Sequence, residues 1–236
     1  MSLVELIAQA DERGLAASGL ACLDRCVPLL GGDDEVLRPL WAGLVDDGEG
    51  WGERVAKVRG ELAPADANAD AVSDTRSDAR SGSGSDARSG SGSDTRSGSG
   101  SDTRSGSGSD TRSGSGSGGG EEIVLLARRM LDGVPVERSG DALREWADVC
   151  SVSALRIHQL LDPLDAGGHD SVAACRAGRT EGASHLVAAE LRRQVVVLEL
   201  LAQHGVAGVR QALGVSTEGR RVLRAVVSRR ARGTRR

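Results

Sequence analysis

The sequence contains no phenylalanine and no tyrosine, and its only tryptophans are Trp41, Trp51 and Trp146. Any core must therefore be built mainly from leucine, valine and alanine, which bury less apolar area per residue than aromatic side chains do. Such aliphatic side chains fill the interfaces between helices well, and no segment has the alternating pattern of a strand. The absences therefore favour an all-α protein.

Long apolar runs are also lacking. Runs such as Val195–Leu198 are far shorter than the roughly 20 residues that a membrane-spanning helix needs. The first residues include Glu5 and have neither the basic segment nor the cleavage pattern of a signal peptide. The four cysteines follow no regular spacing, which favours reduced thiols over a disulfide framework. We expect a cytoplasmic protein that does not associate with a membrane.

Motifs of the common enzyme classes are missing. The sequence has no glycine-rich phosphate loop after a strand, no nucleophile elbow and no His-Glu zinc helix. Acidic residues are numerous, but no pair is marked by its spacing for acid–base catalysis. We therefore expect no enzymatic activity and no bound cofactor.

A repetitive array separates two flanks. The octad SDARSGSG occurs at Ser77–Gly84 and again at Ser85–Gly92, and three copies of SDTRSGSG continue the array to Gly116. Ordering this segment would cost backbone entropy, and it has no side chain that could anchor a core to offset that cost. We expect a disordered linker at residues 73–120 between helical regions at 1–72 and 121–236.

The net charge of −4 hides an asymmetry between the flanks. Residues 1–72 contain 14 acidic and 6 basic residues, residues 121–236 contain 14 and 18, and the array is neutral. Eight of the arginines lie in residues 219–236, which contain no acid. The basic signal therefore belongs to a local tail of the second helical region and not to a whole domain.

The apolar spacing predicts four helices in the first flank, each of them bounded by a capping residue, a glycine or a proline. Pro39 lies inside the third, so that helix either starts late or is kinked there. The expected helices cover residues 2–14, 15–30, 33–45 and 51–62.

The second flank is also expected to be helical. Its longest helix is apolar on nearly all sides, which is typical of a buried helix, so we expect it to be the central helix of this half. Residues 164–180 are expected to be irregular, because glycine, aspartate and arginine dominate them. The expected helices cover residues 121–131, 141–150, 151–161, 183–204 and 205–213, and a last one begins at Ser216.

We expect the two flanks to dock into one body. The first flank is in the size range in which a lone core is marginal, and its wide leucine and valine stripes need to be covered. The opposite charges of the flanks favour association. Closing the inserted loop costs little, since closure entropy grows only with the logarithm of length. Two independent helical domains on a tether are the alternative.

The string WADVCSVSALRIHQLL at residues 146–161 resembles a helix-turn-helix. Ala147 would permit a close helix crossing, and Ser153 would cap the second helix. The exposed face of that second helix would offer Arg156 and Gln159 to DNA bases, together with His158. Two ordinary helices joined by a capped turn are the alternative interpretation.

The arginine-rich tail could neutralise phosphates. It lacks the interleaved aromatic residues that stack on bases, and its valines and leucine also fit a last helix that is docked on the core. We prefer the docked helix. The tail arginines considered for nucleic-acid contact are Arg220, Arg221, Arg224, Arg229 and Arg230.

Cys22 and Cys26 lie one helical turn apart and could face a metal together. The remaining cysteines and histidines lack the paired spacing of a zinc site, and cysteine is among the most often buried residues. We therefore expect both thiols in the core and no metal site.

The sequence resembles short uncharacterised helical proteins of GC-rich actinobacterial genomes. The resemblance lies in LACLDRCVPLL at residues 20–30, LREWADVCSV at 143–152 and STEGRRVLRAVVSRRARG at 216–233. That group has no assigned activity, so the resemblance implies a helical context and no mechanism.

These observations predict an all-α protein in which two flanks of short helices are separated by a disordered linker. The expected function is that of a non-enzymatic helical protein-interaction module with an unidentified protein partner. The alternative is a helix-turn-helix DNA-binding regulator. It would use residues 144–161 and the basic tail, and its partner would be nucleic acid.

Overall fold

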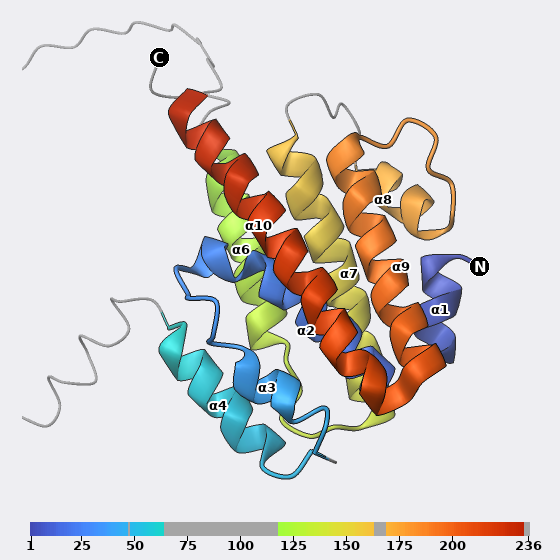
Figure 1. Ribbon diagram of the computed structural model, residues 1–236. Coiled ribbons are helices and arrows are strands. Elements are labelled where there is room, and N and C mark those ends of the chain that lie inside the picture. Colours follow the sequence, from blue (N-terminus) through green and yellow to red (C-terminus); the bar gives the residue numbers. More distant parts are fainter. Residues whose placement is uncertain (47, 64–117, 163–168, 234–236) are drawn as a thin grey trace, which may run out of the picture. The chain divides into compact units, whose positions relative to one another are not determined.

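The computed structural model describes residues 1–46, 48–63, 118–162 and 169–233 (Figure 1). Within these ranges the chain forms helices and no strand, which confirms the all-α prediction. The repeats of the array lie outside the described residues. The helices are α1 (Leu3–Gln9), α2 (Glu12–Cys26), α3 (Arg38–Ala42), α4 (Trp51–Glu61), α6 (Gly118–Asp132), α7 (Gly140–Leu161), α8 (His169–Arg176), α9 (His185–His204) and α10 (Val209–Gly233), with 3-10 turns η1 (Val27–Leu30) and η3 (Gly205–Gly208).

Helix α2 is the central helix of the folded unit. Every residue from Gly14 to Cys26 is buried, and α2 packs against α7, α9 and α10 (Figure 1). The helix expected to be central in the second flank, α9, is instead buried along one side and exposes Val196 on the other. Helix α2 can occupy the centre because small side chains let its neighbours come close: Gly14, Ala16, Ala17, Ser18, Gly19 and Ala21.

Gly19 marks a close approach between α2 and α7. A Cβ atom at this position would lie 2.6 Å from the ring of Trp146. Trp146 is itself buried, and its Nε1 donates a hydrogen bond to the carbonyl oxygen of Met130 at 2.9 Å. This tryptophan therefore joins α7 to both α2 and α6.

The two flanks share one hydrophobic core and form one compact unit. Arginines that donate to backbone carbonyls tie α4 to α6 and to the residues after it. Arg128 Nη1 donates to Leu62 O at 2.6 Å, and Arg59 Nη2 donates to Val134 O at 2.7 Å. The prediction that the flanks dock is confirmed, and the picture of two independent helical domains is wrong.

Four helices differ from the sequence-based prediction in where they begin or whether they form. Helix α2 begins earlier than expected, because Asp11 caps it by accepting a hydrogen bond from Gly14 N at 2.7 Å. Pro39 lies in the first turn of α3 and gives the late start, so α3 is short. Helix α8 forms within residues 164–180, which were expected to be irregular. Helix α6 begins within the stretch assigned to the linker.

Two pairs of expected helices are single continuous helices. Helix α7 runs through Ser151, and α10 runs through Ser216. Neither hydroxyl caps a helix: Ser151 Oγ donates to Gln194 Oε1 at 2.7 Å, and Ser216 Oγ donates to Asp24 Oδ2 at 2.6 Å. The turn that a helix-turn-helix requires is therefore absent from residues 146–161.

Candidate functional site

A buried ion pair lies at the centre of the unit. Arg25 Nη2 lies 2.5 Å from Glu190 Oε1, and neither side chain is exposed to solvent. Burial by itself would raise the pKa of Glu190, but the charge of Arg25, the nearby His158 and the hydrogen bonds from Arg25 and Gln194 together hold that pKa below its ordinary value. Arg25 Nη2 also donates to Cys22 Sγ at 3.4 Å. The centre of this aliphatic core is therefore charged and fully enclosed.

A chain of buried hydrogen bonds leads outward from this ion pair. Gln194 Nε2 donates to Glu190 Oε1 at 2.9 Å, and Ser151 Oγ donates to Gln194 Oε1 at 2.7 Å. Arg176 Nε donates to Ser151 Oγ at 3.1 Å, and its Nη2 pairs with the half-exposed Asp148. The network thus connects the core to the surface at α8.

His158 belongs to the same buried cluster. Its Nδ1 lies 2.8 Å from the carbonyl oxygen of Ala154, so this nitrogen is the donor. Its Nε2 lies 3.6 Å from Glu190 Oε2. Burial lowers the pKa of His158 in spite of the nearby carboxylate. The imidazole is therefore neutral at pH 7 and part of the core.

The two α7 residues predicted to contact bases lie close together, but they contact neighbouring helices. Arg156 Nε donates to Glu122 Oε1 of α6 at 3.1 Å, and its Nη1 donates to Gln159 Oε1 at 2.8 Å. Gln159 is only 4% exposed, and its Nε2 donates to Ser171 Oγ of α8 at 2.7 Å. These side chains do not form an exposed recognition face.

Three of the tail arginines proposed for phosphate contact are engaged with carboxylates of this chain. Arg220 Nη1 lies 2.8 Å from Asp24 Oδ1 and is largely buried. Arg224 Nη2 lies 2.6 Å from Asp34 Oδ1. Arg221 is exposed and lies 3.6 Å from a glutamate one turn earlier on α10. The pairs of Arg220 and Arg224 hold α10 against α2 and the residues after η1, whereas the pair of Arg221 lies within α10.

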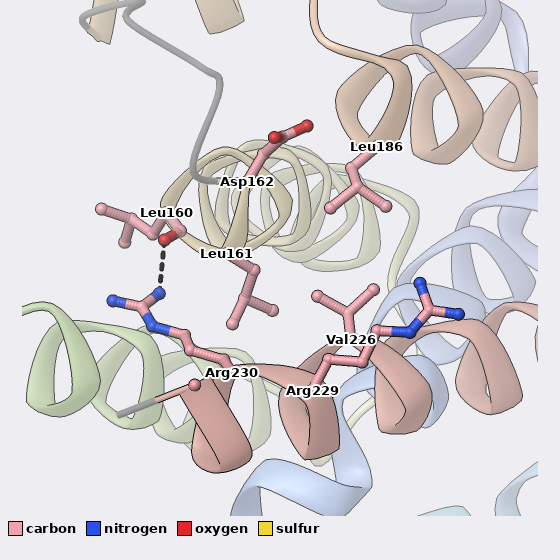
Figure 2. A pocket seen from close by; sticks show the side chains of 8 residues that line it. Leu160, Leu161, Asp162, Leu186, Val226, Arg229 and Arg230 are labelled. Carbon is pink, nitrogen blue, oxygen red and sulfur yellow. Dashed lines mark hydrogen bonds between the residues drawn. The ribbon is translucent and has the colours of Figure 1, made fainter. Parts of the chain in front are cut away.

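The other two tail arginines border a cavity of about 620 Å³, which we call the α7–α10 cavity. Figure 2 shows Arg229 and Arg230 extending to opposite sides of it, with Asp162 across from both. Arg230 Nη1 donates to the carbonyl oxygen of Leu160 at 2.6 Å. The cavity lies where α7 ends, α9 begins and α10 ends, and its apolar lining is Leu160, Leu161, Leu186 and Val226.

The cysteines lie in the core. All four are buried and none forms a disulfide, and burial raises the pKa of Cys22 to about 12. Among the described residues, no group of three or more histidines, cysteines and acids is placed to hold a metal ion. Cys22 and Cys26 therefore act as small apolar residues next to the Arg25 side chain.

Glu190 and Gln194 are the site residues that the sequence analysis missed. They lie one turn apart on the helix that is apolar on most of its surface. A charged residue on a buried stripe requires a buried partner, so a signal was present in the sequence. Its partner Arg25 lies 165 residues away, where no spacing rule could find it.

Comparison with models of protein families, with curated proteins and with solved structures found no match. Among the helices that the structure describes, none combines the length and the apolar character needed to cross a membrane. The function is therefore inferred from the cavities and charges of the chain itself.

Proposed function

We propose that this protein is a non-enzymatic helical protein-interaction module that docks a partner in the α7–α10 cavity. The observation that carries the proposal is an apolar cavity bordered by two guanidinium groups. Apolar cavities with a few polar groups bind through the area they bury, and the polar groups fix the orientation of what is bound. The size and lining of this cavity suit a few aliphatic side chains of a partner protein.

The charges at the rim specify the chemistry of the partner segment. Arg229 is exposed and forms no ion pair within the described residues. A carboxylate beside it gains charge-assisted hydrogen bonds, and Asp162 on the opposite rim repels the same group. The partner is an amphipathic segment with two aliphatic side chains one helical turn apart, followed by an acid that lies at Arg229.

A defined peptide tests this proposal. The probe is a fluorescein-labelled 12-residue amphipathic peptide that carries two leucines at i and i+3 and glutamate at i+7, titrated with the full chain by fluorescence anisotropy. Arg229→Glu is expected to weaken binding by about tenfold or more, because it places like charges together. Arg210→Glu, an exposed arginine at the other end of α10, serves as the matched control and should leave binding unchanged.

Two results would overturn the docking site. One is equal binding of the probe and of a peptide with lysine in place of its glutamate. The other is an affinity that Arg229→Glu does not alter.

Binding of duplex DNA is the alternative function. Arg156 and Gln159 contact neighbouring helices, and Arg220 and Arg224 are paired with acids, so few charges are left for phosphates. We expect weak, salt-sensitive binding or none, and no change with Arg156→Ala. Salt-resistant binding to one defined duplex sequence would favour the regulator instead.

A further inference from the structure

A second cavity, of about 370 Å³, lies between α6, α7 and α8 and is here called the α6–α8 cavity. Three arginines line it, one from each helix: Arg129, Arg156 and Arg176. Its volume falls within the ~300–1,000 Å³ range of small-ligand sites. The apolar part of the wall consists of Leu126, Val149, Val152, Val172 and Ala173.

Positive charge is in excess around this cavity. Arg156 is paired with Glu122 at 3.1 Å, and Arg176 is paired with Asp148. Arg129 is exposed and has no ion pair within the part of the chain that the structure describes. Three guanidinium groups therefore meet two carboxylates, and the surplus charge belongs to Arg129.

Two of the guanidinium groups are held in position by neighbouring side chains. Arg176 is largely buried, and its Nε donates to Ser151 Oγ at 3.1 Å. Arg156 Nη1 donates to Gln159 Oε1 at 2.8 Å. Groups that are already fixed lose little conformational entropy when a ligand binds. The planar fork of arginine also matches the oxygens of a phosphate or carboxylate.

We propose that the α6–α8 cavity binds a small amphiphile with a single anionic head group, a phosphate monoester or a carboxylate. The head group lies at Arg129, and the apolar body of the ligand covers Val149 and Val152. A bare anion would leave the valine wall exposed to water, and a neutral apolar molecule would leave Arg129 without a counter-charge. This site is independent of the α7–α10 cavity and of its proposed protein partner.

Calorimetric titration of the full chain tests the proposal with four probes: octyl phosphate, octanoate, inorganic phosphate and the neutral octyl glucoside. At least one of the first two should bind about tenfold or more tightly than both of the last two, since the site needs charge and apolar area together. The ratio of octyl phosphate to octanoate affinity distinguishes a phosphate ester from a carboxylate as the ligand class.

Variants at exposed arginines locate the binding site. Arg129→Gln should weaken the preferred probe by about tenfold, while Arg210→Gln, remote from the cavity, should leave its affinity unchanged. Unchanged melting temperatures of both variants will show that the fold is intact. The proposal is overturned if neither octyl phosphate nor octanoate binds in preference to the other probes, or if Arg129→Gln binds as tightly as the parent chain.

Discussion

Arg25 of α2 and Glu190 of α9 form an ion pair that is enclosed on all sides, with 2.5 Å between Nη2 and Oε1. The two residues are 165 positions apart, so the pair joins the flanks on either side of the array. Removing two charges from water costs several kcal/mol for each ion, and their attraction offsets that cost only while both are present. The pair therefore adds little net stability but penalises any packing in which the two helices do not meet.

Replacing one member of this pair should destabilise the protein strongly. Glu190→Gln leaves the Arg25 charge buried and unpaired, so we expect the free energy of unfolding to fall by about 3–5 kcal/mol. Urea unfolding followed by far-UV circular dichroism measures the loss. Glu199→Gln, at an exposed position of the same helix, is the control and should change stability by less than about 0.5 kcal/mol.

The double variant Arg25→Met/Glu190→Leu extends this test. It should recover most of the lost stability, because no buried charge is left unpaired. A loss of less than about 1 kcal/mol for Glu190→Gln would contradict the enclosed geometry.

A side chain at position 19 should separate α2 from α7. The Cβ atom of Gly19→Ala would lie 2.6 Å from the rigid ring of Trp146, so we expect a loss of about 1–3 kcal/mol in the free energy of unfolding. Gly214→Ala is the matched control, since it lies within α10 with no atom near its added methyl group. This control should stabilise the protein by about 0.5–1 kcal/mol. Equal effects of the two substitutions would show that the α2–α7 approach is looser than described.

Stability should fall as the pH is lowered through the range in which histidine titrates. Burial lowers the pKa of His158 below its ordinary 6.5 in the folded state. The unfolded chain therefore takes up a proton near pH 6.5 that the folded chain does not bind, and the free energy of unfolding decreases below that pH. Urea unfolding at about pH 7.5 and about pH 5.5 measures the difference.

Variants at two histidines assign this pH dependence. His158→Gln should reduce the difference in stability between the two pH values, whatever its effect on stability itself. His204→Gln, exposed at the end of α9, should leave the difference unchanged. If the pH dependence of stability is unchanged in His158→Gln, it arises from titratable groups other than His158.

The thiols should be unreactive in the folded protein. Reaction needs the thiolate, and burial raises the pKa of Cys22 to about 12 and that of Cys26 and Cys150 well above the ordinary value. With an aromatic disulfide reagent near pH 8, we expect all four cysteines to react in urea and none of these three without it. Cys175 lies on the short helix α8, so it should react first when that helix opens. Cys175→Ser should then abolish the fastest phase, and rapid labelling of Cys22 would contradict the buried core.

The helical class and the docking of the flanks could be predicted because both follow from apolar periodicity. The central place of α2 could not, because its burial depends on small residues such as Gly19 and Ala16, which produce no apolar stripe. Periodicity identifies helices with one apolar side, whereas α2 is surrounded on all sides. A run of small residues within a helical pattern is the signal that identifies such a helix.

The continuity of α7 and α10 was missed for a different reason. Ser151 and Ser216 look like helix caps, because serine favours that position. In the folded unit their hydroxyls instead bond to Gln194 and Asp24 on other helices. A serine satisfied by a distant partner has no local reason to end a helix, and the partner cannot be read from neighbouring sequence. The charge of Arg156 and Arg230 likewise suggests contact with nucleic acid. In the folded unit, distant parts of the chain place both side chains at cavities between helices.

The place of α2 in the chain has a consequence for how the protein is made. Its main neighbours, α7, α9 and α10, all follow the array in sequence. At about 5–20 residues per second of translation, α2 leaves the ribosome on the order of ten seconds before α10 does. Until α7 is synthesised α2 lacks all three of these neighbours, and Arg25 keeps its water until Glu190 is synthesised. The core around α2 can therefore be completed only after α10, the last described helix of this unit, has been synthesised.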